Sequence, residues 1–458
     1  MGQIAVCPLI FSIIFCRTFS FYSDLDGGLL SQHAVAAIRL SRPHKMRSAP
    51  GDNTMSFSSI VRLGAGSPAA KAARRALRVS ALGLALAAIT PAAWAQIKVG
   101  VTLSSTGPAA SLGIPERNTV GLLPTEVAGQ KVEWIVLDDA TDPTQAVRNA
   151  RKLTSEDKVD ILVGTTATPG SIAMVDVAAE SGTAMISVAA SAKIVEPVDD
   201  KRRWAFKTPQ NDALMAGVLA DAMSQANVKT LGFIGFSDAY GDSWLDEITR
   251  AATNKGIKVV ASERFGRTDT SVTGQVLKIV ASRPDAVLVA GSGTPAALPQ
   301  KELRARNFSG TIYQTHGAAN SDVLRVCGKD CEGMMLPAGP LLVAAQLPDD
   351  NEVKQSALNY VQAYEKAFGA GSTNTFGGHM WDAGQLIVNA IPVALATGAK
   401  PGTPAFRTAM RDAVEGVTNL AVSQGVFNMT PKDHAGFDGR AAVMVKVVDG
   451  KWVYQPGK

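Results

Sequence analysis

The chain of 458 residues is longer than one ordinary domain and can bury two cores, and its 46% hydrophobic and 19% charged residues are typical of a globular protein. Its net charge of +5 lies at one end: residues 1–95 hold 10 of the 45 Lys and Arg and 3 of the 40 Asp and Glu, which leaves 35 basic against 37 acidic residues. That remainder lacks the excess of basic residues that nucleic acid binding requires, and no apolar run in it reaches the roughly 18 residues that span a bilayer.

The segment that begins at Met55 has the order of a secretory signal. Five basic residues between positions 62 and 78 precede an apolar stretch from Val79 to Ile89, and Ala93-Trp94-Ala95 follows. Small residues at both ends of that tripeptide suit a signal peptidase, so we expect residues 55–95 to be a signal peptide that is cleaved after Ala95. The alternative is an internal apolar helix.

Residues 1–54 show no periodic pattern that leads into a domain, and Met55 offers a plausible start. We therefore expect residues 1–54 to be a non-structural extension. The alternative is that the apolar run from Ile4 to Phe21 is itself a signal or an anchor.

From Gln96 the sequence alternates short β-rich runs with helical periodicity, which is typical of parallel sheets with crossover helices. The first series of expected strands is 97–103, 132–137, 160–164 and 183–188, and the second is 230–236, 257–263, 286–290 and 311–315. Asp142 and Pro143 predict a helix start, and Gly256 predicts the end of a helix whose apolar stripe includes Trp244 and Ile248.

The chain after Gly339 contains three expected helices, at 352–368, 381–396 and 404–414, and then a strand pair at 441–448 and 451–455. One strand pair cannot form a third domain, so we expect it to return and complete one of two lobes. The sequence thus predicts an α/β fold with two doubly wound parallel-sheet lobes joined by several chain crossings.

Beyond residue 95 the chain has two cysteines, Cys327 and Cys331. In an oxidising compartment this pair could close a short disulfide loop, and the sequence leaves open whether it does. A zinc site is disfavoured because two thiols without further ligands nearby cannot complete a tetrahedron.

Six stretches, in this order and at compatible spacings, resemble the type I periplasmic binding proteins of the leucine/isoleucine/valine-binding kind, which are components of ABC importers. They are Ile97–Gly113, Val136–Leu153, Val159–Ser191, Gly232–Trp244, Pro284–Gly291 and Met429–Gly439. The resemblance implies that residues 96–210 and 340–430 form lobe 1, that 211–339 and 431–458 form lobe 2, and that a multi-stranded hinge joins them. It further implies a periplasmic monomer without a cofactor, whose partners are a small-molecule carboxylate and a membrane permease.

The resemblance places a ligand in the cleft between the lobes, where turns after strands supply backbone N–H groups and small hydroxyls for a carboxylate. On the first lobe the implied residues are Ser105, Leu112, Thr166, Ala167, Thr168, Ala189, Ala190 and Ser191. On the second lobe they are Tyr240, Ser292, Gly293, His316 and Gly317. The alternatives are that the hydroxyls only cap helices, that Tyr240 only covers a helix start and that His316 lies at the surface or the hinge.

One departure from the family bears on the ligand. Relatives that bind α-amino acids carry an acidic residue after the strand that corresponds to 311–315, whereas this chain has no carboxylate there before Asp322. A buried ammonium without a counter-charge is costly. We therefore expect an aromatic or keto acid as ligand rather than a branched-chain amino acid.

The sequence favours binding over catalysis. It contains no G-x-S-x-G, H-E-x-x-H or P-loop motif after residue 95, and the expected roles of His379 and His434 are structural. Asp138 and Asp139 follow a strand, and we expect solvated carboxylates there rather than a catalytic base. A ligand-sensing module of the same fold is the main alternative, and an exported hydrolase is a more distant one.

Overall fold

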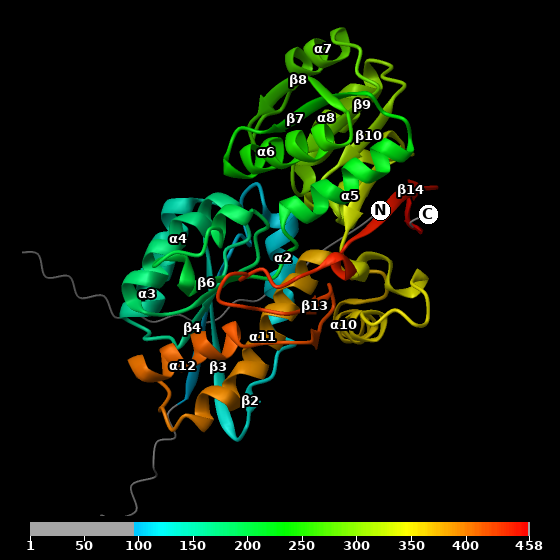
Figure 1. Ribbon diagram of the computed structural model, residues 1–458. Helices are drawn as coiled ribbons and strands as arrows, with labels where there is room; N and C mark the ends of the chain where they lie inside the picture. Colours follow the sequence, from blue (N-terminus) through cyan, green and yellow to red (C-terminus); the bar gives the residue numbers. More distant parts are fainter. Residues whose placement is uncertain (1–95, 457–458) are drawn as a thin grey trace, which may run out of the picture. The chain divides into compact units, whose positions relative to one another are not determined.

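The computed structural model describes residues 96–456, which belong to one compact unit, Thr90–Lys458 (Figure 1). The expected extension at 1–54 and the expected signal peptide at 55–95 lie outside the described residues. Two lobes follow, each built on its own largely parallel sheet, which confirms the predicted α/β class.

The first lobe has a six-stranded sheet in the order β2-β3-β1-β4-β5-β6, in which only β2 and β3 pair antiparallel. Its strands are β1 (Ile97–Leu103), β2 (Glu126–Val127), β3 (Gln130–Asp138), β4 (Ile161–Val163), β5 (Met185–Ser187) and β6 (Ala205–Lys207). The helices between them are α2 (Ala110–Val120), α3 (Pro143–Ser155) and α4 (Thr168–Ser181). Helix α3 begins where predicted because Asp142 accepts hydrogen bonds from the N–H groups of Thr144 and Gln145.

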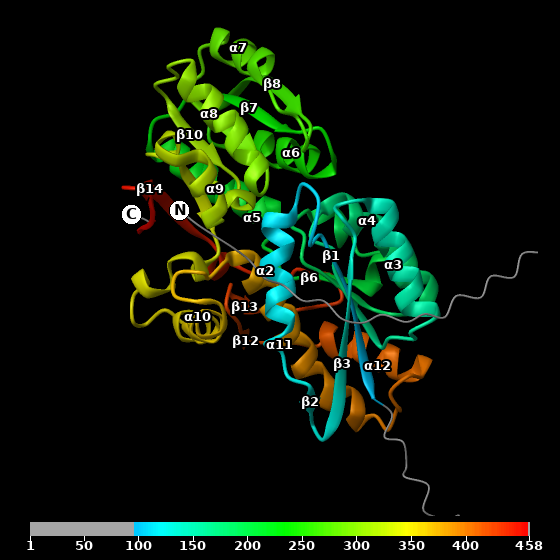
Figure 2. The ribbon, with the colours of Figure 1, turned by 180° about the vertical axis from the view of Figure 1, so that it is seen from behind.

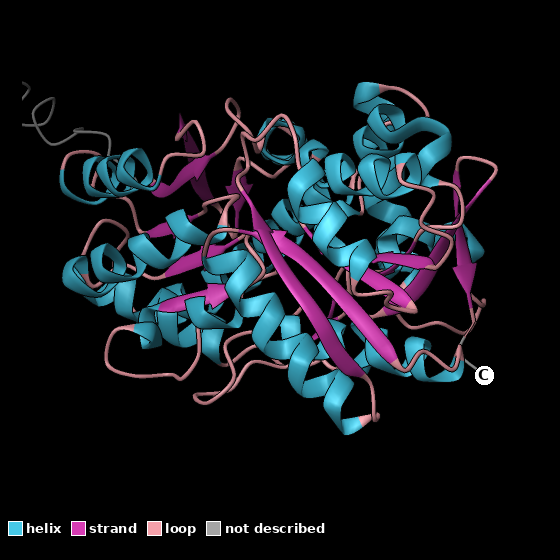
Figure 3. Ribbon diagram, turned by 90° about the horizontal axis from the view of Figure 1, so that it is seen from above, coloured by secondary structure: helices cyan, strands magenta, loops and turns pink. Residues whose placement is uncertain are grey.

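Late parts of the chain cover one face of this sheet. They are α11 (Thr375–Ala396), α12 (Pro404–Glu415) and the short strands β12 (Leu420–Ala421) and β13 (Val426–Phe427), whereas α10 (Lys354–Phe368) packs in a separate core with Leu341 and Val426. Ile161 and Val163 of β4 pack in the core with α11 and α12, whereas Leu162 packs in a second core with α3 and α4. Strand side chains alternate between the two faces of the sheet, so helices cover both faces, and Figure 3 shows helices on either side of the strands. Helices α2 and α11 lie side by side (Figure 2).

The second lobe has a seven-stranded sheet in the order β15-β14-β11-β10-β9-β7-β8. Its strands are β7 (Thr230–Phe236), β8 (Lys258–Phe265), β9 (Ala286–Ala290), β10 (Thr311–Gln314), β11 (Met335–Ala338), β14 (Val443–Val448) and β15 (Lys451–Gln455). The helices are α5 (Asp212–Gln225), α6 (Ala239–Asn254), α7 (Thr273–Ala281), α8 (Ala297–Ala305) and α9 (Ser321–Cys327). The predicted strand pair returns to this lobe, where β14 lies antiparallel to β11.

The chain passes between the lobes three times, at 208–211, at 339–353 and at 428–442. The second passage contains a 3₁₀ segment, η6 (Pro340–Gln346), whose Leu341 and Ala344 pack against α10. These passages correspond to the chain crossings that the sequence predicts.

The largest difference from the predicted boundaries lies at α11. The helix expected at 381–396 begins six residues earlier, at Thr375, where Asn374 caps it by accepting a hydrogen bond from the N–H of Phe376. The sequence pattern did not predict this start because Gly377 and Gly378 follow it, and glycine disfavours helices. Both serve packing: a Cβ on Gly377 would lie 2.1 Å from the Tyr360 hydroxyl, and one on Gly378 2.2 Å from Leu341 Cδ2.

The question of the two cysteines is answered by the structure, which joins Cys327 and Cys331 in a disulfide. Both are buried in the core that α9 shares with β14. The bridge therefore closes the end of α9 against the second sheet.

Candidate functional site

A cavity lies where the carboxyl ends of strands from both sheets meet, and we call it the central cavity. Its volume accessible to the centre of a water molecule is about 20 Å³. It is lined by Leu112, Thr166, Ala167, Thr168, Val188, Ala189, Ala190, Pro209, Tyr240, Arg267, Ser292, His316, Gly317, Phe376 and His379. Ten of the predicted site residues are among these, and those ten come from six separate segments of the chain.

The turn after β4 forms part of the first-lobe wall. Helix α4 begins at Thr168, and its N-cap residue, Ala167, provides no side-chain hydrogen bond. The first N–H groups of a helix have no partner within the helix and carry its positive end. This turn therefore offers the cavity backbone donors suited to an anion.

Two buried hydrogen bonds hold the side chain of Thr166. Its hydroxyl accepts a hydrogen bond from Ser104 N at 2.9 Å and donates one to Glu116. Burial raises the pKa of Glu116 well above its usual value, which favours the protonated form of this side chain. Thr166 thus has a fixed rotamer at the cavity wall.

Asp139 corrects an expectation from the sequence. Asp138 is exposed, but Asp139 is only 1% exposed and is not solvated. It accepts hydrogen bonds from Ser104 Oγ at 2.6 Å, from Thr141 N at 3.0 Å and from the Thr165 hydroxyl. Its carboxylate ties together the turns that follow β1, β3 and β4.

The turn after β5 completes the first-lobe wall with Ala189 and Ala190. Beneath it, the buried Lys207 donates hydrogen bonds from Nζ to the carbonyl oxygens of Ala190 and Pro209, each at 2.8 Å. Burial lowers the pKa of Lys207 to about 8, against the opposing influence of Asp212. The lysine therefore orients two cavity-lining carbonyls away from the cavity.

The second-lobe wall carries a cation that sequence reasoning missed. Arg267 follows β8 and lies 4.2 Å over the ring of Phe236. Its Nε donates to Asp238 at 2.7 Å, and one terminal nitrogen donates to Ser292 Oγ at 3.1 Å. These contacts fix the guanidinium and leave the other terminal nitrogen without a recorded partner among the described residues. The available signal was its position shortly after the expected strand 257–263.

Tyr240 and Gly317 contact one another on this wall. The Tyr240 hydroxyl hydrogen bonds with Thr315 Oγ1 at 2.7 Å. A Cβ at position 317 would lie 2.5 Å from the Tyr240 hydroxyl and 2.7 Å from the Gly291 carbonyl. Only glycine fits there without a shift of the backbone.

Two histidines line the cavity, one from each lobe. His316 follows β10 and is 5% exposed, and His379 lies in the first turns of α11 and is 4% exposed. Burial lowers the pKa of His316 to about 3 and lowers the pKa of His379 well below its usual value, so both imidazoles are neutral. Neither ring nitrogen of His316 has a partner in the described part of the chain. His379 had been expected to be structural, and like Phe376 it was hidden by the misplaced start of α11.

Three predicted site residues do not line the cavity. The N–H of Ser105 donates a hydrogen bond to the carbonyl oxygen of Leu103. Ser191 Oγ donates to Ser243 Oγ at 3.0 Å, which links the first lobe to α6 of the second. A Cβ on Gly293 would lie 2.3 Å from Leu112 Cδ1, so this glycine permits close approach of the lobes.

The charges around the cavity are unequal. Among the described residues that line it, Arg267 carries a charge at neutral pH and none is Asp or Glu. Backbone donors, a hydroxyl, an arginine and neutral imidazoles together match an organic anion. They give an ammonium group no counter-charge.

A two-lobed α/β fold with a cavity between its lobes defines a class of ligand-binding proteins that close around a small molecule. The family model described as "Periplasmic binding protein" matches residues 96–451, and the chain belongs to this family.

Individual relatives agree with this assignment. A leucine-, isoleucine-, valine-, threonine- and alanine-binding protein of Pseudomonas aeruginosa is 24% identical over 52% of this chain, and the match spans 65% of that protein. An extracellular ligand-binding receptor from Rhodopseudomonas palustris HaA2 is 45% identical with a TM-score of 0.77, covering 79% of this chain and 100% of that one. An ABC transporter solute-binding protein from R. palustris, solved with benzoate, shares the fold at 22% identity and a TM-score of 0.66, covering 78% and 95%.

Within residues 96–456, none of the helices combines the length and the apolar character that crossing a membrane demands.

Proposed function

We propose that this protein is the solute-binding component of an ABC importer, and that it captures a small organic acid without an ammonium group. The observation that carries the proposal is the charge of the central cavity: among residues 96–456, Arg267 lines it and no carboxylate does. A buried ammonium there would lose its hydration without gaining an opposite charge. A carboxylate there would instead gain an opposite charge, that of Arg267.

The ligand carboxylate is held between the two lobes. The N–H groups at the start of α4 and in the turn at Ala189 and Ala190 donate from the first lobe, and Arg267 donates from the second. A guanidinium is suited to this role because its planar donors match the two oxygens of a carboxylate. Contacts from both walls stabilise the arrangement in which the lobes touch.

The apolar part of the ligand lies against Leu112, Val188, Tyr240 and Phe376. The neutral His316 and His379 each offer one donor and one acceptor, which suit a keto or hydroxyl oxygen on the ligand. Aromatic acids and 2-keto acids meet both conditions. Benzoate in the R. palustris protein of the same fold supports the aromatic class, although that likeness extends to the fold alone.

Export, lobe boundaries and partners belong to the same proposal. The signal at 55–95 directs the chain to the periplasm, and cleavage leaves Gln96 as its first residue. Residues 96–210 and 340–430 form one lobe and 211–339 and 431–458 the other. A membrane permease receives the ligand, and the protein carries no catalytic activity.

The test uses protein recovered from the periplasm of a bacterial host that expresses the full chain. Isothermal titration with leucine, benzoate, cinnamate and 4-methyl-2-oxopentanoate compares the ligand classes directly. We expect at least one acid to bind in the micromolar range or better and leucine not to bind. Tight leucine binding, with no response to any acid, would overturn the proposed ligand class.

A further inference from the structure

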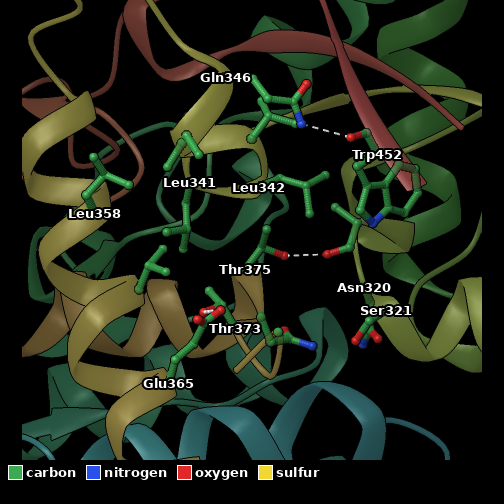
Figure 4. A pocket seen from close by; sticks show the side chains of 17 residues that line it. Asn320, Ser321, Leu341, Leu342, Gln346, Leu358, Glu365, Thr373, Thr375 and Trp452 are labelled. Carbon is green, nitrogen blue, oxygen red and sulfur yellow. Dashed lines mark hydrogen bonds between the residues drawn. The ribbon is translucent and has the colours of Figure 1, made fainter. Parts of the chain in front are cut away.

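A second cavity lies beside the passage at 339–353, and Figure 4 shows its side chains. Its volume accessible to the centre of a water molecule is about 280 Å³. It is lined by Ala319, Asn320, Ser321, Leu341, Leu342, Val343, Ala344, Ala345, Gln346, Leu358, Val361, Glu365, Gly371, Thr373, Asn374, Thr375 and Trp452. We call it the second cavity.

Its walls come from both lobes and from the passage between them. Trp452 of β15 and Asn320 belong to the second lobe, Leu358 and Glu365 of α10 belong to the first, and η6 lies between them. Polar contacts hold the walls in place: Thr375 Oγ1 donates to the Ala319 carbonyl at 2.6 Å, and Gln346 Nε2 donates to the Trp452 carbonyl at 3.0 Å (Figure 4). The cavity is therefore formed by the contact between the lobes, and hydrogen bonds fix its walls.

Glu365 gives this cavity a negative charge. It is the one charged residue among the described residues that line the cavity. One of its oxygens accepts a hydrogen bond from Thr373 Oγ1 at 3.0 Å, and no Lys or Arg of the described chain forms an ion pair with it. The second oxygen remains available to a cation.

Trp452 supplies an independent observation. Its indole Nε1 is buried and has no hydrogen-bond partner in the described part of the chain. A buried N–H without an acceptor is unfavourable, because it has lost its hydrogen bond to water. This N–H has almost no accessible surface, so an oxygen on a molecule in the cavity would accept its hydrogen bond after a shift of the indole, while Leu341, Leu358 and Val361 would pack against the apolar group of that molecule.

We propose that the second cavity binds a small organic ammonium compound that carries an apolar group and an acceptor oxygen. Glu365 pairs with the ammonium, the indole N–H of Trp452 donates to the oxygen, and the leucine-lined wall covers the apolar group. This site is separate from the central cavity and goes beyond the proposed function, which concerns an anion.

Leucinol is a suitable probe because it combines an ammonium, an isobutyl group and a hydroxyl. Isothermal titration of the periplasmic protein, saturated with its acid ligand or free of it, should detect leucinol binding and no binding of 4-methylpentan-1-ol, which lacks only the ammonium. Glu365→Gln should weaken leucinol binding at least 10-fold. In a ¹⁵N-labelled sample, leucinol should shift the indole N–H signal that Trp452→Phe removes.

A relocated carboxylate is the matched control. Gln362 lies on α10 but is exposed and outside the cavity lining. The double variant Glu365→Gln, Gln362→Glu keeps the composition and net charge of α10, and it should bind leucinol as weakly as Glu365→Gln alone. Arg267→Met should leave leucinol binding unchanged, which separates this site from the proposed function.

The proposal fails if leucinol produces no heat and no indole shift in the wild-type protein. It also fails if Glu365→Gln binds leucinol as the wild type does. Loss of leucinol binding in Arg267→Met would place the probe in the central cavity and would equally overturn the second site.

Discussion

The central cavity and the second cavity lie next to each other and carry opposite charges. Phe376 lines the central cavity, and the preceding residue, Thr375, lines the second cavity. After β10, Gly317 lines the central cavity and Ala319 lines the second cavity. Within the described part of the chain, the central cavity is lined by an arginine and no carboxylate, whereas the second is lined by a carboxylate and by neither Lys nor Arg. Two sites with such different linings therefore share one contact between the lobes.

This difference shows that the place of a cavity in the fold does not determine the charge of the ligand that it suits. Both cavities draw on the segment after β10 and on the start of α11, which the fold places between the lobes. The charge comes from single residues on other elements, Arg267 after β8 and Glu365 on α10. Replacing one of these residues should change the ligand class while the lobes keep their structure.

Arg267→Met should produce the largest effect. It removes the positive charge of the central cavity and leaves a ligand carboxylate facing Asp238 without its partner. Loss of one member of a buried charge pair costs about 2 to 3 kcal/mol, which corresponds to roughly 30- to 150-fold weaker binding of the acid. Isothermal titration of wild type and variant with the same acid measures this ratio.

Arg264→Met is the control, because Arg264 lies in the same segment, over the ring of Phe233, and outside the cavity lining. It should bind the acid within about twofold of the wild type, which corresponds to an energy below about 0.5 kcal/mol. Equal losses in the two variants would mean that Arg267 acts through the packing of the lobe and does not contact the ligand.

Thr166→Val should have an intermediate effect. The variant keeps the shape of the side chain but leaves Ser104 N without its acceptor and Glu116 without its donor. Such a loss costs about 1 to 3 kcal/mol of folding stability, and we expect roughly fivefold weaker acid binding as the turn before α4 loses its fixed geometry. Chemical denaturation and isothermal titration measure the two quantities.

Thr166→Ser keeps the hydroxyl and should recover most of both losses. If the serine variant binds the acid as weakly as the valine variant, the methyl group and not the hydroxyl holds this turn.

The sequence was sufficient for the features that depend on local patterns. The strands 230–236, 286–290 and 451–455 have the predicted bounds, because buried strands are short apolar runs with clear ends. Thr166, Ala167, Ala189 and Ala190 were found because they follow such strands, whose carboxyl ends meet at one edge of a sheet.

The residues that were missed depend on contacts between distant segments. His379 lines the central cavity because α11 begins at Thr375, and that start is concealed by two glycines whose reason is packing against Tyr360 and Leu341. Arg267 reads as an ordinary surface residue until its contacts with Asp238 and Ser292 direct it inward. The burial of Asp139 likewise depends on hydroxyls that follow three different strands.

The smallest expected effect concerns pH and His316. Because burial holds the pKa of His316 at about 3, its imidazole stays neutral from pH 8 down to pH 5. A protonated imidazole would attract the carboxylate, so a histidine with an ordinary pKa near 6.5 would strengthen acid binding as the pH falls through that value. With the lowered pKa, this gain is confined to pH values close to 3.

Comparison with His316→Gln isolates this contribution, because other groups near the cavity, such as Lys207 with a pKa of about 8 and Asp212 with one of about 6, titrate in both proteins. We expect the ratio of the two dissociation constants for the acid, measured at pH 5, 6, 7 and 8, to vary by less than about twofold. A ratio that favours the wild type progressively below pH 7 would show that His316 gains a proton in the complex. The central cavity would then hold a second positive charge beside Arg267, and its contrast with the second cavity would be greater still.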